Sequence, residues 1–376
     1  MSLRIVITGA GGLLGWHAAA HLHANNCAAT FTGQPQPFEV ELLDRTSFNN
    51  DQLLDAALSS ADAVLHFAGV NRAEDSELRM ANVEIAERLI LACKRAGSSP
   101  HIVYANSTHA AFDSVYGKSK QMADECFKNY DHKYTNLIFP HIFGERAKPN
   151  YNNVTATIID KLIRGEAPQI NQDGEVCLLH AGQAVDVAIN CVEKSITGTV
   201  QPNGEPMKVQ SLYERLLSFH ELYQENLFPD LSNQLDISLF NSYRAVTYPS
   251  GWPRQLNMHT DQRGTLFEAV KSVGGGGQSF ASTTGPGITR GDHFHLNKVE
   301  RFLVLQGEAK IRVRRVMSDE VWEYSVSGKQ PAIVDMPTLH THSIENVGEA
   351  PLLTLFWTNE LFNPKSPDTY ADRVVR

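Results

Sequence analysis

Four residues near the C-terminus could together hold a metal ion. His293 and His295 are two positions apart, so in an extended strand their imidazoles point to the same face. Glu300 is an odd number of positions further on, and it reaches that face only if the chain turns at 296–298. His342 would add an imidazole from another strand. Three imidazoles and one carboxylate are a donor set that suits a divalent metal ion such as zinc.

A second candidate site lies near the N-terminus, where three glycines follow an apolar run. Gly9, Gly12 and Gly15 come directly after the predicted strand Arg4–Thr8 and open a predicted helix. Glycines let the backbone turn sharply and approach a pyrophosphate, whose charge then meets the free N–H groups and positive dipole of the helix start. The spacing predicts a dinucleotide-binding loop, with a plain strand-to-helix turn as the alternative interpretation.

A tyrosine and a lysine further along could exchange a proton with a substrate. Tyr116 and Lys120 are four positions apart, which places them one turn apart on a helix. An ammonium at that distance favours the phenolate, so Tyr116 could give a proton to a substrate oxygen or take one from it. Such a pair is common on helix surfaces. It indicates a catalytic site here because the glycine loop precedes it.

The elements that would position these residues differ between the two halves. Residues 1–200 alternate β-branched runs with helical patterns, which is typical of βαβ units. The expected strands are Arg4–Thr8, Ala28–Thr32, Ala63–Phe67, His101–Ala105 and Thr135–Phe139. After a break at 248–253, short runs separated by Gly and Pro predict strands at Phe302–Leu305, Lys310–Arg315, Val321–Val326 and Leu352–Trp357. We therefore predict an α/β, Rossmann-like, doubly wound parallel sheet over 1–248 and an all-β domain over 249–376.

Composition narrows the class of protein. The chain has 376 residues, 42% of them hydrophobic, which is enough for two domains. The net charge of −9 is spread out and there is no basic cluster, so we expect no nucleic-acid partner. The five cysteines are odd in number and form no Cys-x-x-Cys pair, which favours a reduced, cytoplasmic protein. No run approaches the roughly 20 apolar residues of a membrane span.

The metal pattern resembles the paired motifs of the cupin family of β-barrels. The matching positions are Gly287, His293, His295, Glu300, Gly307, Pro337, His342 and Asn346. Leu339 and Pro331 stand where glycine is usual in the second motif. The resemblance implies a cupin barrel with zinc on the three histidines and Glu300. His340 shares a face with His342 and could replace it or join it, and we favour His342. The ion could also be only structural.

The glycine spacing together with Tyr116 and Lys120 resembles the extended short-chain dehydrogenase/reductase family. The resemblance implies that Tyr116 is the acid/base, that Lys120 also holds the nicotinamide ribose and that Ser107, or else Thr108, binds the substrate oxygen. The implied cofactor-binding residues are Gly9, Gly12, Leu13, Leu14, Gly15, Gly33, Phe67, Ala68, Gly69, Asn82, Tyr116, Lys120 and His141. At His141 the family more often has asparagine.

The choice of nicotinamide should be decided at the end of the second strand, where an acidic residue would hold the ribose hydroxyls of NAD. With that strand expected at Ala28–Thr32, the deciding residues are Thr32, Gly33 and Gln34, and none is acidic. This permits NADPH. Asp44, like Asp62 and Asp186, is interpreted as a cap or turn residue.

Both halves together resemble a family of bifunctional enzymes of capsular polysaccharide biosynthesis. Shared segments include 66–72, 148–152, 261–264, 286–289, 359–364 and 367–370. The resemblance implies a homodimer that acts on a UDP-linked 4-keto-6-deoxy sugar, a precursor of UDP-N-acetyl-L-fucosamine. The cupin would epimerise C3, with Lys298 or Tyr324 as candidate base, and the reductase would then reduce C4 with NADPH. The alternatives are a single-activity reductase whose cupin only binds ligand or mediates dimerisation, and an iron dioxygenase.

Overall fold

The computed structural model describes residues 2–376, whose contacts divide into two compact units. The first unit comprises residues up to 157 together with 170–210, and the second comprises 158–169 with 211–376. Helices α6 (Val154–Ile163) and α8 (Val209–Gln224) run across the divide. The domain boundary expected at 248/249 falls later in the chain and stays a prediction. No helix among residues 2–376 is long and apolar enough to cross a membrane.

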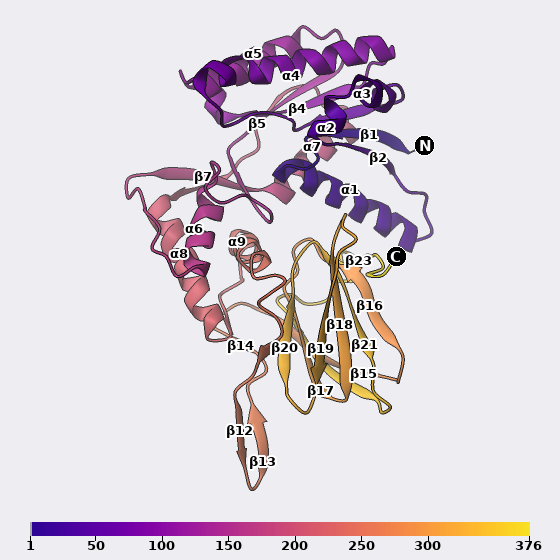
Figure 1. Cartoon of the computed structure of the whole chain (residues 1–376), viewed down its shortest axis with the longest axis vertical. Helices are drawn as coiled ribbons and strands as arrows, with labels where there is room; N and C mark the ends of the chain where they lie inside the picture. Colours follow the sequence, from indigo (N-terminus) through magenta and orange to yellow (C-terminus); the bar gives the residue numbers. More distant parts are fainter. Residues whose placement is uncertain (1) are drawn as a thin grey trace. The chain divides into compact units, whose positions relative to one another are not determined.

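The first unit is built on a six-stranded sheet in the order β2-β1-β3-β4-β5-β8, and every pair of neighbours is parallel (Figure 1). The strands are β1 (Leu3–Thr8), β2 (Phe38–Leu43), β3 (Ala63–His66), β4 (His101–Ser107), β5 (Tyr134–Phe139) and β8 (Gly198–Val200). From β1 the chain first adds β2 on one side and then β3, β4, β5 and β8 on the other side. Where the strand order changes side in this way, a crevice opens at the carboxyl ends of the strands.

Helices cover both faces of this sheet. They are α1 (Leu13–Phe31), α2 (Arg45–Phe48), α3 (Asp51–Leu58), α4 (Asp75–Ala96), α5 (Val115–Lys128) and α7 (Ala181–Glu193), with a short 3-10 helix, η1 (Thr108–Ala111). Alternation along β1 explains the two layers: Ile5 and Ile7 join the core with α1 and α7, whereas Val6 joins the core with α3, α4 and α5. The doubly wound parallel fold is confirmed.

One strand prediction is wrong. Ala28–Thr32 is not the second strand, because residues 13–31 form one continuous helix, α1. The hydroxyls of Thr30 and Thr32 donate to backbone carbonyls four residues earlier, a bond that accommodates β-branched threonine on a helix. The true second strand, β2, begins at Phe38 and pairs with β1 in parallel.

A smaller sheet of the first unit follows the main one. It joins β6 (His141–Phe143), β7 (Glu175–His180) and β9 (Glu205–Lys208) in the order β6-β7-β9. Strand β6 comes directly after β5, so it continues the chain from the carboxyl edge of the main sheet.

The second unit holds two five-stranded antiparallel sheets, in the orders β11-β20-β17-β22-β15 and β19-β18-β21-β16-β23. Their strands are β11 (Arg254–Gln255), β15 (Gln278–Thr284), β16 (Thr289–Phe294), β17 (Glu300–Gln306), β18 (Glu308–Arg315), β19 (Val321–Ser327), β20 (Ala332–Met336), β21 (His340–Asn346), β22 (Leu352–Thr358) and β23 (Tyr370–Ala371). All four strand-like runs predicted for this half lie within strands, so its β character is confirmed.

Two short strand pairs complete the second unit. Strands β10 (Leu227–Phe228) and β14 (Lys271–Ser272) form one pair. The other is a hairpin of β12 (Met258–Asp261) and β13 (Gly264–Phe267), which leads away from the two larger sheets of this unit (Figure 1).

Helices α8 and α9 (Gln234–Ala245) belong to the second unit because buried polar contacts tie them to its strands. Arg301 and Asp335 form a fully buried bidentate ion pair, with N···O distances of 2.6 and 2.8 Å. The Tyr223 hydroxyl of α8 donates to the same carboxylate at 2.7 Å. From α9, Arg244 donates to the carbonyl of Met336 at 3.0 Å. A buried ion pair whose remaining hydrogen-bonding groups are satisfied fixes the orientation of the helices that contact it.

Candidate functional site

The glycine loop of the first unit joins β1 to α1 in a space that admits no side chains. Gly9 has a φ of 69°, and a Cβ there would lie 2.7 Å from the backbone nitrogen of Ala68. A Cβ on Gly15 would lie 2.3 Å from the carbonyl oxygen of Gly9. Any larger residue at these positions would push the loop away from β3 and α1, so packing alone requires glycine at both.

The start of α1 can receive an anion. Its N-cap residue is Gly12, which has no side chain to cap the first N–H groups, and its first turn carries no acidic residue. Leu13 and Leu14 occupy that first turn. Uncapped N–H groups and the positive end of the helix dipole both favour a pyrophosphate there.

The segment Phe67–Gly69 follows β3 and lies against the glycine loop, as the Gly9 contact with Ala68 shows. Asn82 of α4 holds this segment in place. Its carboxamide accepts from the N–H of Val70 at 3.0 Å and donates to the Val70 carbonyl at 2.9 Å and to Ser119 at 2.9 Å. All of these partners belong to the protein, so Asn82 shapes the cofactor loop from behind.

Ser107, Tyr116 and Lys120 come together at the carboxyl end of β4. Ser107 is the last residue of that strand, and Tyr116 lies in the first turn of α5, which Ser114 caps. Burial raises the pKa of the Tyr116 hydroxyl, and its hydrogen bond with Ser107 partly offsets this rise. The hydroxyl is therefore protonated at neutral pH and can donate to a substrate oxygen.

Lys120 lies one turn behind Tyr116 and is buried. Its ammonium donates to the carbonyl of Ala105 at 2.6 Å and lies 4.1 Å from the centre of the Tyr104 ring. Burial lowers the pKa of Lys120 to about 7, while the carboxylate of Asp124 acts in the opposite direction. A lysine whose pKa lies near neutrality changes charge easily, as a group in a proton-transfer site should.

His141 and Gly33 were also expected to bind the cofactor, and they lie at different places in the first unit. His141 begins β6, directly after β5, and its buried Nε2 has no hydrogen-bond partner. Burial first, and then the nearby His109, lower the pKa of His141 to about 4, so the ring is neutral. Gly33 follows the C-terminal end of α1. At about 1.5 Å per residue that end lies nearly 30 Å from Gly12, so Gly33 does not reach the glycine loop.

The four residues expected to bind metal converge in the second unit. One possible ligand atom from each of His293, His295, Glu300 and His342 lies within 4.8 Å of the others. Oε2 of Glu300 lies 3.1 Å from Nε2 of His295 and 3.1 Å from Nε2 of His342. His293 pairs with His342 across β16 and β21, beside a bulge after Gly291 that directs its side chain.

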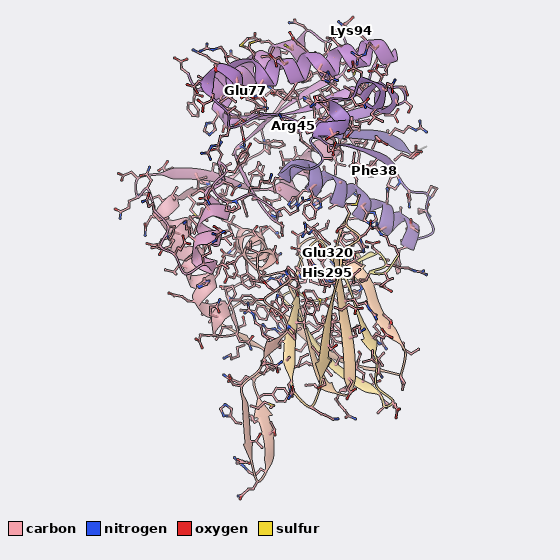
Figure 2. All side chains as sticks on the ribbon, in the orientation of Figure 1. Phe38, Arg45, Glu77, Lys94, His295 and Glu320 are labelled. Atoms are coloured by element: carbon pink, nitrogen blue, oxygen red, sulfur yellow. The ribbon has the colours of Figure 1, made fainter. Side chains whose placement is uncertain are left out.

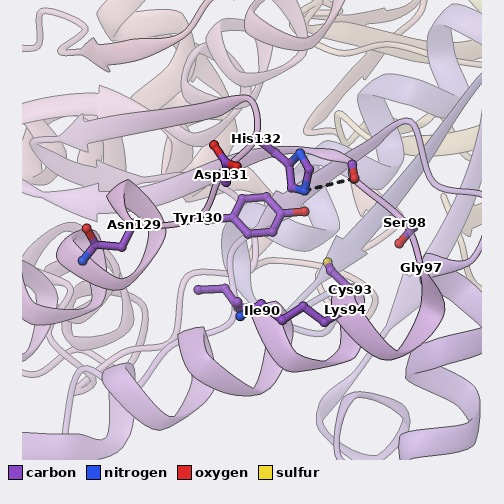
Figure 3. A pocket seen from close by; sticks show the side chains of 10 residues that line it. Ile90, Cys93, Lys94, Gly97, Ser98, Asn129, Tyr130, Asp131 and His132 are labelled. Carbon is purple, nitrogen blue, oxygen red and sulfur yellow. Dashed lines mark hydrogen bonds between the residues drawn. The ribbon is translucent and has the colours of Figure 1, made fainter.

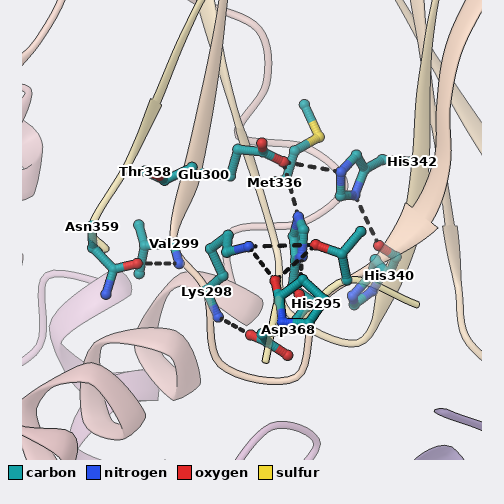
Figure 4. Close-up of polar contacts among 12 residues, drawn as sticks. His295, Lys298, Val299, Glu300, Met336, His340, His342, Thr358, Asn359 and Asp368 are labelled. Carbon is teal, nitrogen blue, oxygen red and sulfur yellow. Dashed lines mark hydrogen bonds and ion pairs between the residues drawn. The ribbon is translucent and has the colours of Figure 1, made fainter. Parts of the chain in front are cut away.

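The far nitrogens of two imidazoles are fixed by backbone carbonyls (Figure 4). His295 contacts the carbonyl of Asp368 through Nδ1 at 2.5 Å, and His342 contacts the carbonyl of His340 through Nδ1 at 3.1 Å. A carbonyl can only accept, so each Nδ1 carries a proton, and Nε2 is the nitrogen that could bind a metal ion after it loses its own proton to solvent. Three ring nitrogens and one carboxylate in this geometry fit a divalent ion such as zinc.

Asp368 is a site residue that the sequence reasoning missed, although it lies within a segment shared with the related family. Its carboxylate accepts from the backbone N–H groups of Leu296, Asn297 and Lys298 at 2.8 to 2.9 Å. These residues form the turn that was required to bring Glu300 to the histidine face. The tail of the chain thus fixes the turn between two ligand positions.

The electrostatics of the cluster are those of a cation site. Burial alone would raise the pKa of the Glu300 carboxyl, but hydrogen bonds and charge from His295 and His342 hold that pKa well below its usual range. Burial, and then the neighbouring imidazoles, lower the pKa of His293 to about 3. An ionised carboxylate beside a neutral imidazole is the protonation state that metal ligation requires.

The remaining candidates around the cluster have other partners. His340 is not in the converging group, and its Nδ1 lies 2.7 Å from the carbonyl of Thr338. The Lys298 ammonium is buried and donates to the carbonyl of Pro367 at 2.7 Å. The Tyr324 hydroxyl donates to the carbonyl of Pro249 at 3.0 Å.

A cavity of about 300 Å³ lies elsewhere in the first unit, between the C-terminal ends of α4 and α5 (Figure 3). Cys93, Ser98 and Tyr130 are among its lining residues. Burial raises the pKa of the Cys93 thiol to about 11, so it is not a nucleophile at neutral pH. None of the residues expected to do chemistry lines this cavity.

The fold, the glycine loop and the Ser107, Tyr116 and Lys120 group define the class of protein. The chain belongs to the NAD dependent epimerase/dehydratase family, whose model matches residues 5–196. Residues 259–370 match the polysaccharide biosynthesis C-terminal domain. Over nearly its whole length the chain is similar to the capsular polysaccharide assembling protein CapF from Staphylococcus aureus. The two are 30% identical with a TM-score of 0.58, over 99% of this chain and 100% of that one.

Two curated proteins are also similar to this chain. UDP-2-acetamido-2,6-beta-L-arabino-hexul-4-ose reductase from Pseudomonas aeruginosa is 30% identical over 381 residues, which are 99% of each chain. Spore coat polysaccharide biosynthesis protein SpsL from Bacillus subtilis is 25% identical over 124 residues, which are 31% of this chain and 82% of that protein. The resemblance to a family of capsular polysaccharide biosynthesis, predicted from the two halves together, is confirmed.

Proposed function

We propose that this chain is a bifunctional nucleotide-sugar enzyme. It epimerises C3 of a UDP-4-keto-2-acetamido-2,6-dideoxy-L-hexose and then reduces the C4 ketone, giving UDP-2-acetamido-2,6-dideoxy-L-talose. The observation that carries the proposal is that one chain holds two different carbonyl-directed sites. One is the Ser107, Tyr116 and Lys120 group beside a dinucleotide loop, and the other is the buried cluster of three histidines and Glu300.

The reduction follows from the first site. A nicotinamide dinucleotide supplies the hydride to C4 of the ketone. Ser107 and Tyr116, which already contact one another, donate hydrogen bonds to the carbonyl oxygen. As negative charge develops there, Tyr116 transfers its proton, and the product is the C4 alcohol. The Lys120 ammonium one turn away stabilises the phenolate left behind.

The epimerisation follows from the second site, which we propose is a zinc cupin. The three histidines and Glu300 would hold zinc, which would supply positive charge to the C4 carbonyl oxygen and so make the adjacent C3 proton easier to remove. Removal of that proton to a base on one face and delivery of a solvent-derived proton to the opposite face would invert C3. Lys298 remains the proposed base, and its bond to the Pro367 carbonyl must open for it to act. The same ketone is then the hydride acceptor.

We propose a nicotinamide dinucleotide as the cofactor. Thr32 does not decide whether that dinucleotide carries a 2′-phosphate. The earlier reason for NADPH assumed that the second strand ends there, whereas residue 32 caps α1. The glycine loop and the start of α1 suit the pyrophosphate of either dinucleotide.

A homodimer is also part of the proposal. In the hairpin of β12 and β13, Met258 is 45% exposed and Leu266 is 65% exposed. A two-stranded hairpin is marginal in water alone, so apolar side chains there favour burial against a second copy. Light scattering should give twice the chain mass, and Leu266→Glu should shift the mass toward one chain.

The experiment that tests both activities uses the full chain and the 4-keto substrate in heavy water. Without nicotinamide, NMR should show deuterium entering at C3. Tyr116→Phe should keep this exchange and lower the rate of reduction by about 100-fold or more. Tyr151→Phe, an exposed tyrosine, is the matched control and should change neither.

Two results would contradict the proposal. A zinc-loaded wild-type chain that leaves C3 unlabelled would reduce the protein to a single-activity reductase. Loss of both exchange and reduction in Tyr116→Phe, with folding intact, would mean that one shared site performs both steps.

A further inference from the structure

A buried network of two imidazoles and one carboxylate lies in the first unit, outside both proposed sites. His17 lies just after the first turn of α1. His180 is the last residue of β7 and caps α7, and Glu145 lies in the chain that follows β6. All three side chains are buried. The network therefore joins the helix that follows the glycine loop to two segments that come much later in the chain.

Backbone groups determine where the two imidazoles carry their protons. Nε2 of His17 lies 3.0 Å from the carbonyl oxygen of Glu145, which can only accept, so this nitrogen carries a proton. Burial, the largest effect, lowers the pKa of His17 to about 3, so the ring is neutral. Nδ1 of His180 accepts from the N–H of Gly182 at 3.2 Å, so the proton of His180 is on Nε2. This Nε2 donates to the Glu145 carboxylate at 2.9 Å.

The backbone directly before Glu145 is packed against both imidazoles. Gly144 has a φ of 152°, and a Cβ there would lie 3.2 Å from Nε2 of His180 and 3.3 Å from Nε2 of His17. A side chain at this position would force one of the rings to shift. The place of Glu145 is thus set by close packing as well as by hydrogen bonds.

Strand β6 connects this network to the reduction site. In the register of β4 and β5, Ser107 lies beside Phe139, and His141 follows two residues later as the first residue of β6. The buried Nε2 of His141 has no hydrogen-bond partner among the described residues, so it can meet a polar group of the cofactor. Glu145 comes four residues after His141. The contacts of Glu145 with α1 and α7 therefore act on the backbone that carries His141.

We infer that Glu145 is a positioning residue for hydride transfer. Its carbonyl contacts His17 and its carboxylate contacts His180, and these contacts hold β6 at a fixed place relative to the glycine loop. The pyrophosphate would lie at that loop and the nicotinamide ring beside β6, so their spacing sets the ring against C4 of the ketone. The inference rests on the proposed reduction and adds a residue to it. Hydride transfer needs the reacting atoms about 3 to 3.5 Å apart, and a misplacement of about 1 Å can cost about 100-fold in rate.

The test separates the rate of reduction from dinucleotide affinity, with whichever of NADH and NADPH the wild-type chain oxidises. Glu145→Ala keeps the carbonyl contact with His17 and removes the carboxylate. It should lower kcat by about tenfold or more, while the dissociation constant of the dinucleotide, measured by nicotinamide fluorescence, changes less than about threefold. Glu145→Gln keeps an oxygen that can accept from His180 and should recover most of the rate.

His180→Asn tests the same contact from its other side, and it decides the question if Glu145→Ala does not fold. Asparagine is a good N-cap residue, so α7 should keep its start, but its shorter side chain no longer donates to Glu145. This variant should lower kcat as Glu145→Ala does. The double variant should be about as slow as Glu145→Ala, because both changes remove the same contact. Glu175→Ala, an exposed residue of the same strand β7, is the matched control and should keep the wild-type kcat.

Hydrogen exchange at C3 is an internal reference, because it is proposed for the cluster that contains His295 in the second unit (Figure 2). It should keep its wild-type rate in Glu145→Ala. Wild-type kcat in both Glu145→Ala and His180→Asn would overturn the inference. A loss of dinucleotide affinity or of C3 exchange as large as the loss of kcat would also overturn it. A wild-type chain that oxidises neither NADH nor NADPH would instead overturn the proposed reduction, so the two failures are distinguishable.

Discussion

The cluster of three histidines and Glu300 and the glycine loop differ in how they could receive a ligand. In the cluster, His295 and His342 are each fixed from behind by a backbone carbonyl, and Glu300 already lies between them. At the loop, the start of α1 has no side-chain cap, so its first-turn N–H groups can donate to an anion. The cluster gathers its residues from antiparallel strands, whereas the loop lies where a parallel strand ends. The first arrangement organises side chains in advance, and the second keeps backbone groups available.

The largest expected effect tests the organised site. Glu300→Gln keeps the size of the side chain but removes the charge that two imidazoles contact. We expect metal affinity to fall by at least about 100-fold, beyond the range caused by changes outside the ligand set. Metal content after dialysis against zinc buffers measures this, with the exposed Glu349→Gln as the matched control. A Glu300→Gln chain that retains metal would show that the carboxylate is not a ligand.

A smaller effect tests the claim that the cluster is held from behind. Asp368→Ala removes the acceptor for three N–H groups in the turn before Glu300. Metal affinity should drop about tenfold, which is typical for residues that orient ligands. The same dialysis measures the metal affinity of this variant. Asp372→Ala would be a poor control because that residue pairs with Arg314. Asp319→Ala, which is almost fully exposed, is better. Unchanged metal affinity would mean that the turn at 296–298 keeps its conformation without Asp368.

The smallest effect concerns the cost of burying Lys120. Its folded-state pKa of about 7 lies below the usual 10.5. Between these values the unfolded chain keeps a proton that the folded chain releases, so rising pH favours the folded state. From pH 7 to pH 8 this group should add about 1 kcal/mol to the free energy of unfolding.

Urea unfolding of the wild type and of Lys120→Met measures this contribution, because the variant lacks the group and should lack that share of the rise. Lys118→Met is the matched control on the exposed face of the same helix. An equal pH dependence in wild type and Lys120→Met would show that the buried ammonium carries no such cost.

The sequence predicted that His293, His295, Glu300 and His342 would come together, whereas it misplaced one strand of the other unit. The spacing of His293, His295 and Glu300 required a turn, and the structure contains it. The anchor of that turn, Asp368, is some 70 residues away along the chain, and local pattern reasoning does not register a contact of that kind.

The error at Ala28–Thr32 has a local cause. The segment contains threonine and phenylalanine, which suit strands, but it continues an alanine-rich helix without a break until Gly33. Alanine has the strongest helix propensity, and tertiary packing of α1 decides the rest. Because the strand was misplaced, Asp44 was interpreted only as a cap. It is a cap, as the structure confirms, and it also directly follows β2.

The buried contact of Arg301 and Asp335 with Tyr223 constrains how the β-rich half could be exchanged between proteins during evolution. Recombination at 248/249 would move the strands but leave α8 behind. The transferred piece would then expose the Arg301–Asp335 ion pair, which normally accepts a hydrogen bond from the Tyr223 hydroxyl, together with the Trp357 ring on which Phe228 stacks. A viable transfer must include the helices from about residue 211 onward, so the inherited module is longer than its strands.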